Sequence, residues 1–164
     1  MTITLKRGRS SRNFCVSIYL DAISQAAIRK PFRQTALDQV SSGPVKPVAA
    51  VEAKIVIGFM WPMDPPIWVD RLNNAAAIYN KTHKVIVVNQ RIVRNFERSP
   101  LRQDFRNALE MLMLHELLRW LIDDLGGKSE HFPRGDKRDA VYNFENAAFT
   151  DCENRNKTLE IMNV

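Results

Sequence analysis

The pentapeptide His115-Glu116-Leu117-Leu118-Arg119 contains the side chains best suited to chemistry in this chain. It matches the zinc-binding pattern H-E-x-x-H at every defined position except the last, where arginine replaces histidine. In that pattern two imidazoles one helical turn apart bind the metal, and the glutamate between them acts as a general base. Arginine cannot bind a metal in this way, because its guanidinium stays protonated and has no lone pair to donate. The motif therefore indicates a zinc-site ancestry and, at Arg119, a departure that bears directly on activity.

The surrounding sequence predicts that this motif lies on the longest helix of the chain. Apolar residues recur at helical spacing through residues 105–125, and Ser99-Pro100 supplies an N-cap followed by a favoured first helical residue. Gly126-Gly127 is expected to end the helix. On such a helix His115 and Arg119 share one face, as the two histidines of the complete pattern would.

Shorter segments on either side of this helix predict an α+β domain. The runs 52–59 and 84–89 are apolar and rich in β-branched residues, which is typical of strands. Residues 69–79 are Ala-rich and are predicted to be helical. Residues 140–149 are predicted to form a final helix that contains Glu145.

The N-terminal part of the chain differs from the remainder in charge. Residues 1–34 contain seven Lys or Arg and one Asp, which accounts for the whole formal net charge of +6, and the remaining residues carry 17 basic and 17 acidic side chains. A loose helical pattern over residues 13–29 ends at Lys30-Pro31, and Ser, Gly and Pro residues then mark a linker. We therefore divide the chain into a basic N-terminal segment and linker, residues 1–47, and a domain, residues 48–164.

Composition argues against several classes of protein. The basic residues form a leader and not a stripe along a folded element, which argues against nucleic-acid binding. No stretch approaches the roughly 20 apolar residues of a membrane span. Cys15 and Cys152 are too few for a disulfide framework and lack the spacing of a zinc knuckle. Residues 1–26 lack the unbroken apolar stretch of a signal peptide, because Ser17 and Asp21 interrupt it.

The order of these features resembles the bacterial metallopeptidase toxin domains found at the ends of polymorphic and type VI secretion effectors. The distinctive parts are His-Glu-Leu-Leu-Arg-Trp at 115–120 and Phe-Glu-Asn-Ala-Ala-Phe at 144–149. The resemblance implies a zincin-like α+β fold with a small β-sheet, a long active-site helix and a C-terminal helix. It also implies peptide-bond hydrolysis with one zinc ion, in which His115 and Glu145 are metal ligands and Glu116 is the general base. Arg119 occupies the position of the remaining ligand.

Unless the match to the motif is a coincidence, Arg119 leaves two interpretations of the site open. Another residue completes the metal site, for which His131 is the candidate, or the guanidinium lies between carboxylates in place of the metal. The carboxylates considered for that role are Glu116, Glu145 and, as an i+4 ion-pair partner, Asp123.

The first interpretation predicts a hydrolase that acts on a protein or peptide substrate. The second predicts a catalytically dead binding module of the same fold, which recognises a peptide or an immunity-type partner protein. In both, the resemblance implies synthesis in a bacterial cytoplasm and secretion or injection by a route that needs no signal peptide.

Overall fold

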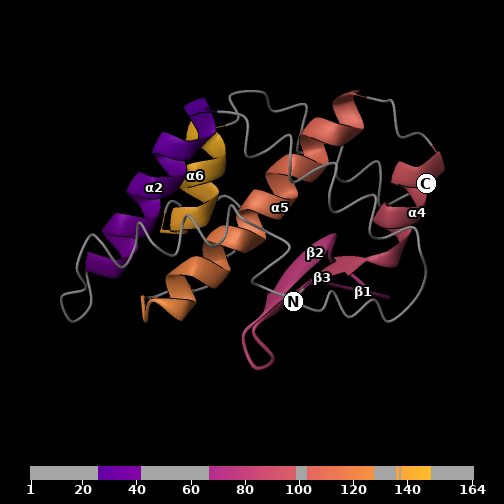
Figure 1. Ribbon diagram of the computed structural model, residues 1–164, viewed down its shortest axis with the longest axis horizontal. Helices are drawn as coiled ribbons and strands as arrows, with labels where there is room; N and C mark the ends of the chain where they lie inside the picture. The colour runs from indigo at the N-terminus through magenta and orange to yellow at the C-terminus, as the bar shows by residue number, and fades with distance from the viewer. Residues whose placement is uncertain (1–25, 42–66, 99–102, 128–135, 137, 149–164) are drawn as a thin grey trace.

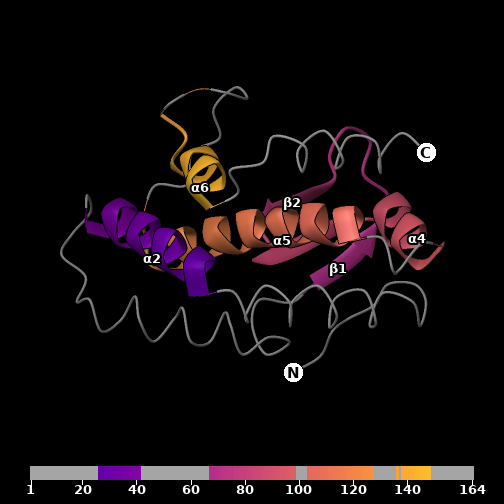
Figure 2. The same cartoon turned by 90° about the horizontal axis from the view of Figure 1, so that it is seen from above.

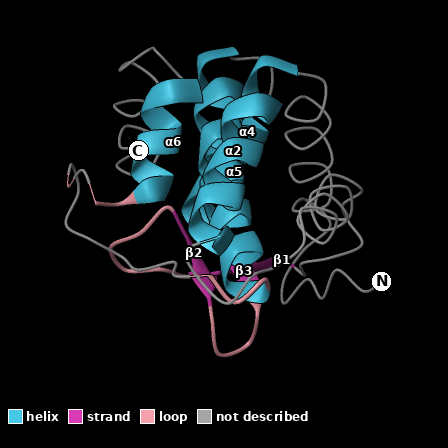
Figure 3. Ribbon diagram, turned by 90° about the vertical axis from the view of Figure 1, so that its left-hand side faces the viewer, coloured by secondary structure: helices cyan, strands magenta, loops and turns pink. Residues whose placement is uncertain are grey.

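The computed structural model describes residues 26–41, 67–98, 103–127, 136 and 138–148. These residues form an α+β arrangement in which a small sheet packs against helices that gather on one side of it (Figure 3). The expected strand at 52–59, the helix start Ser99-Pro100 and the candidate ligand His131 lie outside the described residues.

The described sheet has three strands in the order β1-β3-β2. Its central strand, β3 (Val85–Asn89), pairs in parallel with β1 (Ile67–Asp70) and antiparallel with β2 (Ala77–Asn80). All five residues of β3 are buried, as expected for an apolar, β-branched run in a central position. The strand predicted at 84–89 is therefore confirmed.

The prediction of a helix over residues 69–79 is wrong. This segment contains the end of β1, a connection and most of β2. Every second residue of both strands is buried, so the burial follows the two-residue period of a strand. Asn89 of β3 also fixes the connection, because its side-chain amide donates hydrogen bonds to the carbonyls of Leu72 (3.0 Å) and Ala75 (2.9 Å). Pairing with β3 outweighs the local preference of alanine for a helix.

The motif lies on α5 (Gln103–Asp124), which runs between the sheet and two further helices, α2 (Ala26–Ser41) and α6 (Ala140–Ala148) (Figures 1 and 2). It contacts β2 and β3 on one side and the two helices on the other. Over its described residues this confirms the predicted long helix, and α6 confirms the predicted C-terminal helix. None of the described helices is both long enough and apolar enough to span a bilayer.

Gly126-Gly127 ends α5 as the sequence predicts. Gly126 has a φ of 75°, a conformation that glycine adopts without strain. Its N–H donates to the carbonyl of Asp123 (2.9 Å), and the N–H of Gly127 donates to the carbonyl of Ile122 (2.8 Å). These two bonds are the Schellman pattern of a helix C-terminus.

Helix α2 continues through Lys30-Pro31, where the sequence predicts a helix end. A proline inside a helix removes a backbone hydrogen bond and costs about 3 kcal/mol. Tertiary packing offsets this cost, because Phe32 and Ala36 on the same helix are buried in the core. The ring of Phe32 packs edge-on against that of Phe144 in α6, with centroids 5.5 Å apart. Part of the basic N-terminal segment thus shares a core with the remainder of the chain.

Helix α4 (Gln90–Arg98) follows β3 without a break. Asn89 caps it, because its side-chain oxygen accepts a hydrogen bond from the N–H of Arg91 at 3.0 Å. Ile92 and Val93 bury this helix against the sheet, where it contacts β1 and β3.

Candidate functional site

The fold brings His115 on α5 against Glu145 on α6, although 30 residues separate them in the sequence. Nδ1 of His115 hydrogen-bonds to Oε1 of Glu145. The His115 side chain is 18% exposed and that of Glu145 is 11% exposed, so the pair is largely removed from water. The structure therefore brings together the two residues that the resemblance pairs as metal ligands.

Arg119 lies one turn along α5 and is almost completely buried, with 2% of its surface exposed. Its Nε donates a hydrogen bond to Nε2 of His115 at 3.0 Å. Its Nη2 donates to Oδ2 of Asp139 at 2.8 Å. The guanidinium thus donates to the ring nitrogen of His115 that does not contact Glu145. It also links this histidine to the buried carboxylate of Asp139.

Asp139 is the member of the site that sequence analysis missed. Its Oδ1 accepts the N–H groups of Val141 (3.0 Å) and Tyr142 (3.1 Å), so this residue is the N-cap of α6. Burial alone would raise the pKa of Asp139, but hydrogen bonds from Arg119 and from the backbone of Tyr142 hold it below its ordinary value. An Asp directly before a predicted helix is a readable capping signal. The contact of its second oxygen with Arg119 depends on how α6 packs against α5, which the sequence does not show.

Glu116 is buried and lies between α5 and β2, with 4% of its surface exposed. Its Oε2 accepts the backbone N–H of Tyr79 in β2 at 2.6 Å. Burial raises the pKa of Glu116 above its ordinary value, although the charge of Arg119 and the Tyr79 hydrogen bond oppose this effect. The glutamate of the motif therefore holds the helix to the outer strand of the described sheet.

The hydrogen bonds of His115 define its neutral form. Nε2 must keep a lone pair to accept from Arg119, so the proton is on Nδ1 and is donated to Glu145. Burial by itself lowers the pKa of His115, but the hydrogen bond to Glu145 and the nearby charge of Glu116 raise it above its ordinary value. This raised pKa favours the imidazolium, whereas the contact with Arg119 requires the neutral ring. We assign the neutral ring, because an imidazolium would place an N–H against the N–H of Arg119.

Asp123 lies near the end of α5 and faces the sheet. Its Oδ2 accepts the hydroxyl hydrogen bond of Tyr79 at 2.8 Å, and its Oδ1 lies 3.0 Å from Nζ of Lys81. The sequence suggested Asp123 as an ion-pair partner of Arg119, but the ion pair of Arg119 in the structure is with Asp139. Asp123 and Glu116 together set the position of α5 along β2.

The described residues do not fit a zinc ion at this site. Both ring nitrogens of His115 are engaged, and the adjacent guanidinium is a cation with no lone pair. Within the described ranges, no group of three His, Cys, Asp or Glu side chains is placed to hold a metal ion. The candidate substitute ligand, His131, lies outside them.

The cluster also does not offer a free general base of the histidine–carboxylate type. A carboxylate on Nδ1 orients a histidine for proton transfer through Nε2, but here that nitrogen accepts from Arg119. The chemistry that the geometry supports is the mutual neutralisation of buried charges.

Comparison of the chain with protein families, characterised proteins and solved structures finds no match. The assignment of function therefore depends on the residues of this site.

Proposed function

We propose that this chain is a zincin-like domain of the bacterial toxin metallopeptidase type in which Arg119 stands in place of the metal. It acts by binding a peptide or an immunity-type partner protein. The observation that carries this proposal is the Arg119 bridge, at 3.0 Å from His115 and 2.8 Å from Asp139. A guanidinium can hold such groups together as a metal would, but it supplies no open coordination position for hydrolysis.

The order of the elements supports the zincin-like part of the proposal. A small mixed sheet precedes the long helix α5, a Gly-Gly end follows it, and α6 returns Glu145 to His115. The motif glutamate and the downstream glutamate are buried, and the motif histidine, whose side chain is 18% exposed, contacts the downstream one. The same resemblance supports synthesis in a bacterial cytoplasm and delivery without a signal peptide.

Strand β2 supports the binding part of the proposal. It is an outer strand of the described sheet, and the N–H of Tyr79 points away from β3 to Glu116. An extended peptide binds to such a strand by adding main-chain hydrogen bonds, with pockets for alternate side chains giving selectivity. A peptide at this edge takes over the N–H that Glu116 now accepts, so binding is coupled to the motif.

Zinc content per chain, measured by elemental analysis, tests the role of Arg119. The protein is purified without chelator and without added metal, as wild type, Arg119→His and Arg119→Lys. We expect little zinc in the wild type and in Arg119→Lys, which keeps a cation, and close to one equivalent in Arg119→His, which completes the ligand pattern. About one equivalent in the wild type would reject the metal-free proposal. A folded Arg119→His variant without zinc would remove the support for a zincin-like lineage.

A further inference from the structure

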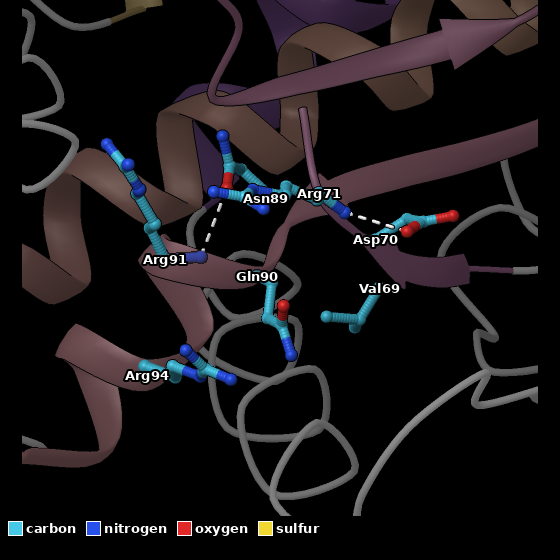
Figure 4. Close-up of a pocket in the computed structure, with 7 residues that line it drawn as sticks. All are labelled: Val69, Asp70, Arg71, Asn89, Gln90, Arg91 and Arg94. Carbon is cyan, nitrogen blue, oxygen red and sulfur yellow. Dashed lines mark hydrogen bonds between the residues drawn. The ribbon is translucent and has the colours of Figure 1, made fainter. Parts of the chain in front are cut away.

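A second site lies at the other edge of the sheet. A pocket of about 700 Å³ opens at the carboxyl ends of β1 and β3, beside the start of α4 (Figure 4). β3 separates this pocket from β2, because β1 and β2 pair with opposite sides of the central strand. The pocket is therefore distinct from the cluster around Arg119.

The lining of this pocket carries positive charge. Three residues that carry guanidiniums, Arg71, Arg91 and Arg94, line it, and Asp70 is the one acidic residue among its described lining residues. Across the part of the chain that the structure describes, none of these guanidiniums makes an ion pair or a side-chain hydrogen bond. Residues 35–164 carry equal numbers of basic and acidic side chains, so this charge is a local concentration and not a general property of the domain.

The backbone that carries these arginines is fixed. Asn89 is 1% exposed, caps α4 through the N–H of Arg91, and holds the connection after β1 through the carbonyls of Leu72 and Ala75. In Figure 4 the guanidinium of Arg94 and the amide of Gln90 extend into the same space, and Arg91 extends to the other side of the helix start. The start of α4 adds the positive end of its helix dipole.

We propose that this pocket binds a small organic molecule that carries a phosphate group. Guanidiniums bind phosphate oxygens through paired, charge-assisted hydrogen bonds, and a helix start favours the same anion. The volume falls within the range of small-molecule sites, which is about 300–1,000 Å³, and a lone phosphate would fill little of it. Gln90 and Asp70 supply polar groups for hydroxyl or amino groups on the organic part. This inference goes beyond the binding function proposed above and does not depend on it.

Isothermal titration calorimetry of the full chain tests the proposal with three probes: inorganic phosphate, adenosine 5′-monophosphate and adenosine. We expect phosphate to bind weakly, the nucleotide to bind more tightly and adenosine not to bind. Arg94→Ala and Arg71→Ala, on different sides of the pocket, should each raise the Kd for the nucleotide about tenfold, a loss of about 1.4 kcal/mol. The matched control is Arg98→Ala, an exposed arginine on α4 that does not line the pocket, and it should leave the Kd within about twofold.

Three results would overturn the proposal. The first is no binding of phosphate or nucleotide at up to roughly 10 mM, which is weaker than the millimolar affinity of a minimal site. The second is equal weakening by Arg98→Ala and by the pocket variants, which would show attraction to general surface charge. The third is nucleotide binding no tighter than that of phosphate, which would reject the organic ligand. Zinc content and the Arg119 variants play no part in this test, so the two proposals can fail separately.

Discussion

Replacing Arg119 with methionine tests whether its guanidinium holds the candidate site together. Arg119→Met keeps much of the aliphatic side chain and removes the charge. Arg119 is 2% exposed and its partner Asp139 is 5% exposed, so the variant leaves a buried carboxylate without its cation. Removal of one partner of a buried ion pair costs about 3–5 kcal/mol, compared with about 0–1 kcal/mol for a pair at the surface. We therefore expect the variant to lose about 3–5 kcal/mol of unfolding free energy.

Urea unfolding followed by tryptophan fluorescence measures this loss in a double-mutant cycle with Asp139→Asn. Asparagine is also a good N-cap, so Asp139→Asn removes the charge and keeps the hydrogen bonds to the start of α6. The cycle should give a coupling energy of about 1–3 kcal/mol between the two side chains. The folded pKa of Asp139 is lowered, so the contribution of its charge is complete above its unfolded pKa and is lost as the pH falls through the folded value. The difference between wild type and Arg119→Met should therefore narrow in acid.

Two outcomes would refute the reasoning. If Arg119→Met is as stable as the wild type at neutral pH, the guanidinium does not stabilise the site. If the coupling energy with Asp139 is below about 0.5 kcal/mol, the two residues act independently. In either case Arg119 could not be regarded as an internal substitute for a metal ion.

Three further predictions, one of them with a control variant, test the packing of α5. Glu116→Gln should be neutral or stabilising at pH 7, because the raised pKa of Glu116 means that burial disfavours its charge. The stability of the wild type should rise relative to that of the variant as the pH falls through this pKa. Urea titrations at several pH values would show this change. Tyr79→Phe removes the hydroxyl hydrogen bond to α5 and should lower the unfolding free energy in urea by about 1 kcal/mol. Lys81→Ala is the control, because the Lys81 side chain is 74% exposed, and it should change stability by less than about 0.5 kcal/mol. Equal losses in the two variants would contradict this ranking. Gly127→Ala should lower the midpoint of thermal unfolding and reduce the unfolding free energy by about 1–3 kcal/mol, because an added Cβ would lie 3.0 Å from a backbone carbonyl of α2. An unchanged midpoint would show that the end of α5 can move.

Much of the described fold follows from local sequence patterns. The apolar run of β3 and the helical periodicity of α5 and α6 each predict the element that the structure contains. The errors at residues 69–79 and at Pro31 have a different origin. In the first, the Ala-rich segment becomes strand because β3 is available as a partner, and in the second, a helix continues past proline because Phe32 and Ala36 are buried. Tertiary contacts decide both cases, and a local pattern contains no information about them.

The same distinction between local patterns and tertiary contacts applies to the candidate site. The relation of His115 to Arg119 follows from helical spacing, and both side chains lie where that spacing predicts, one turn apart and in contact. The approach of Glu145 to His115 was implied by the resemblance alone, since residue spacing cannot place α6 against α5. Asp139 was readable as a helix cap, but its bond to Arg119 requires the same interhelical packing. Contacts within one helix were thus predictable, and contacts between helices were not.

The number of carboxylates around the motif helps to explain the origin of the site. A buried arginine needs one carboxylate for charge balance, and Asp139 supplies it. His115 and Arg119 together nevertheless have two carboxylate partners, because Glu145 binds His115 separately. In a metal site of the type that the chain resembles, Glu145 would be a ligand beside His115, and a carboxylate such as Asp139 would orient a histidine at position 119. An arrangement with one acid for each motif position is excessive for a structural arginine. The second acid would be expected of the lineage proposed above, in which a histidine preceded Arg119.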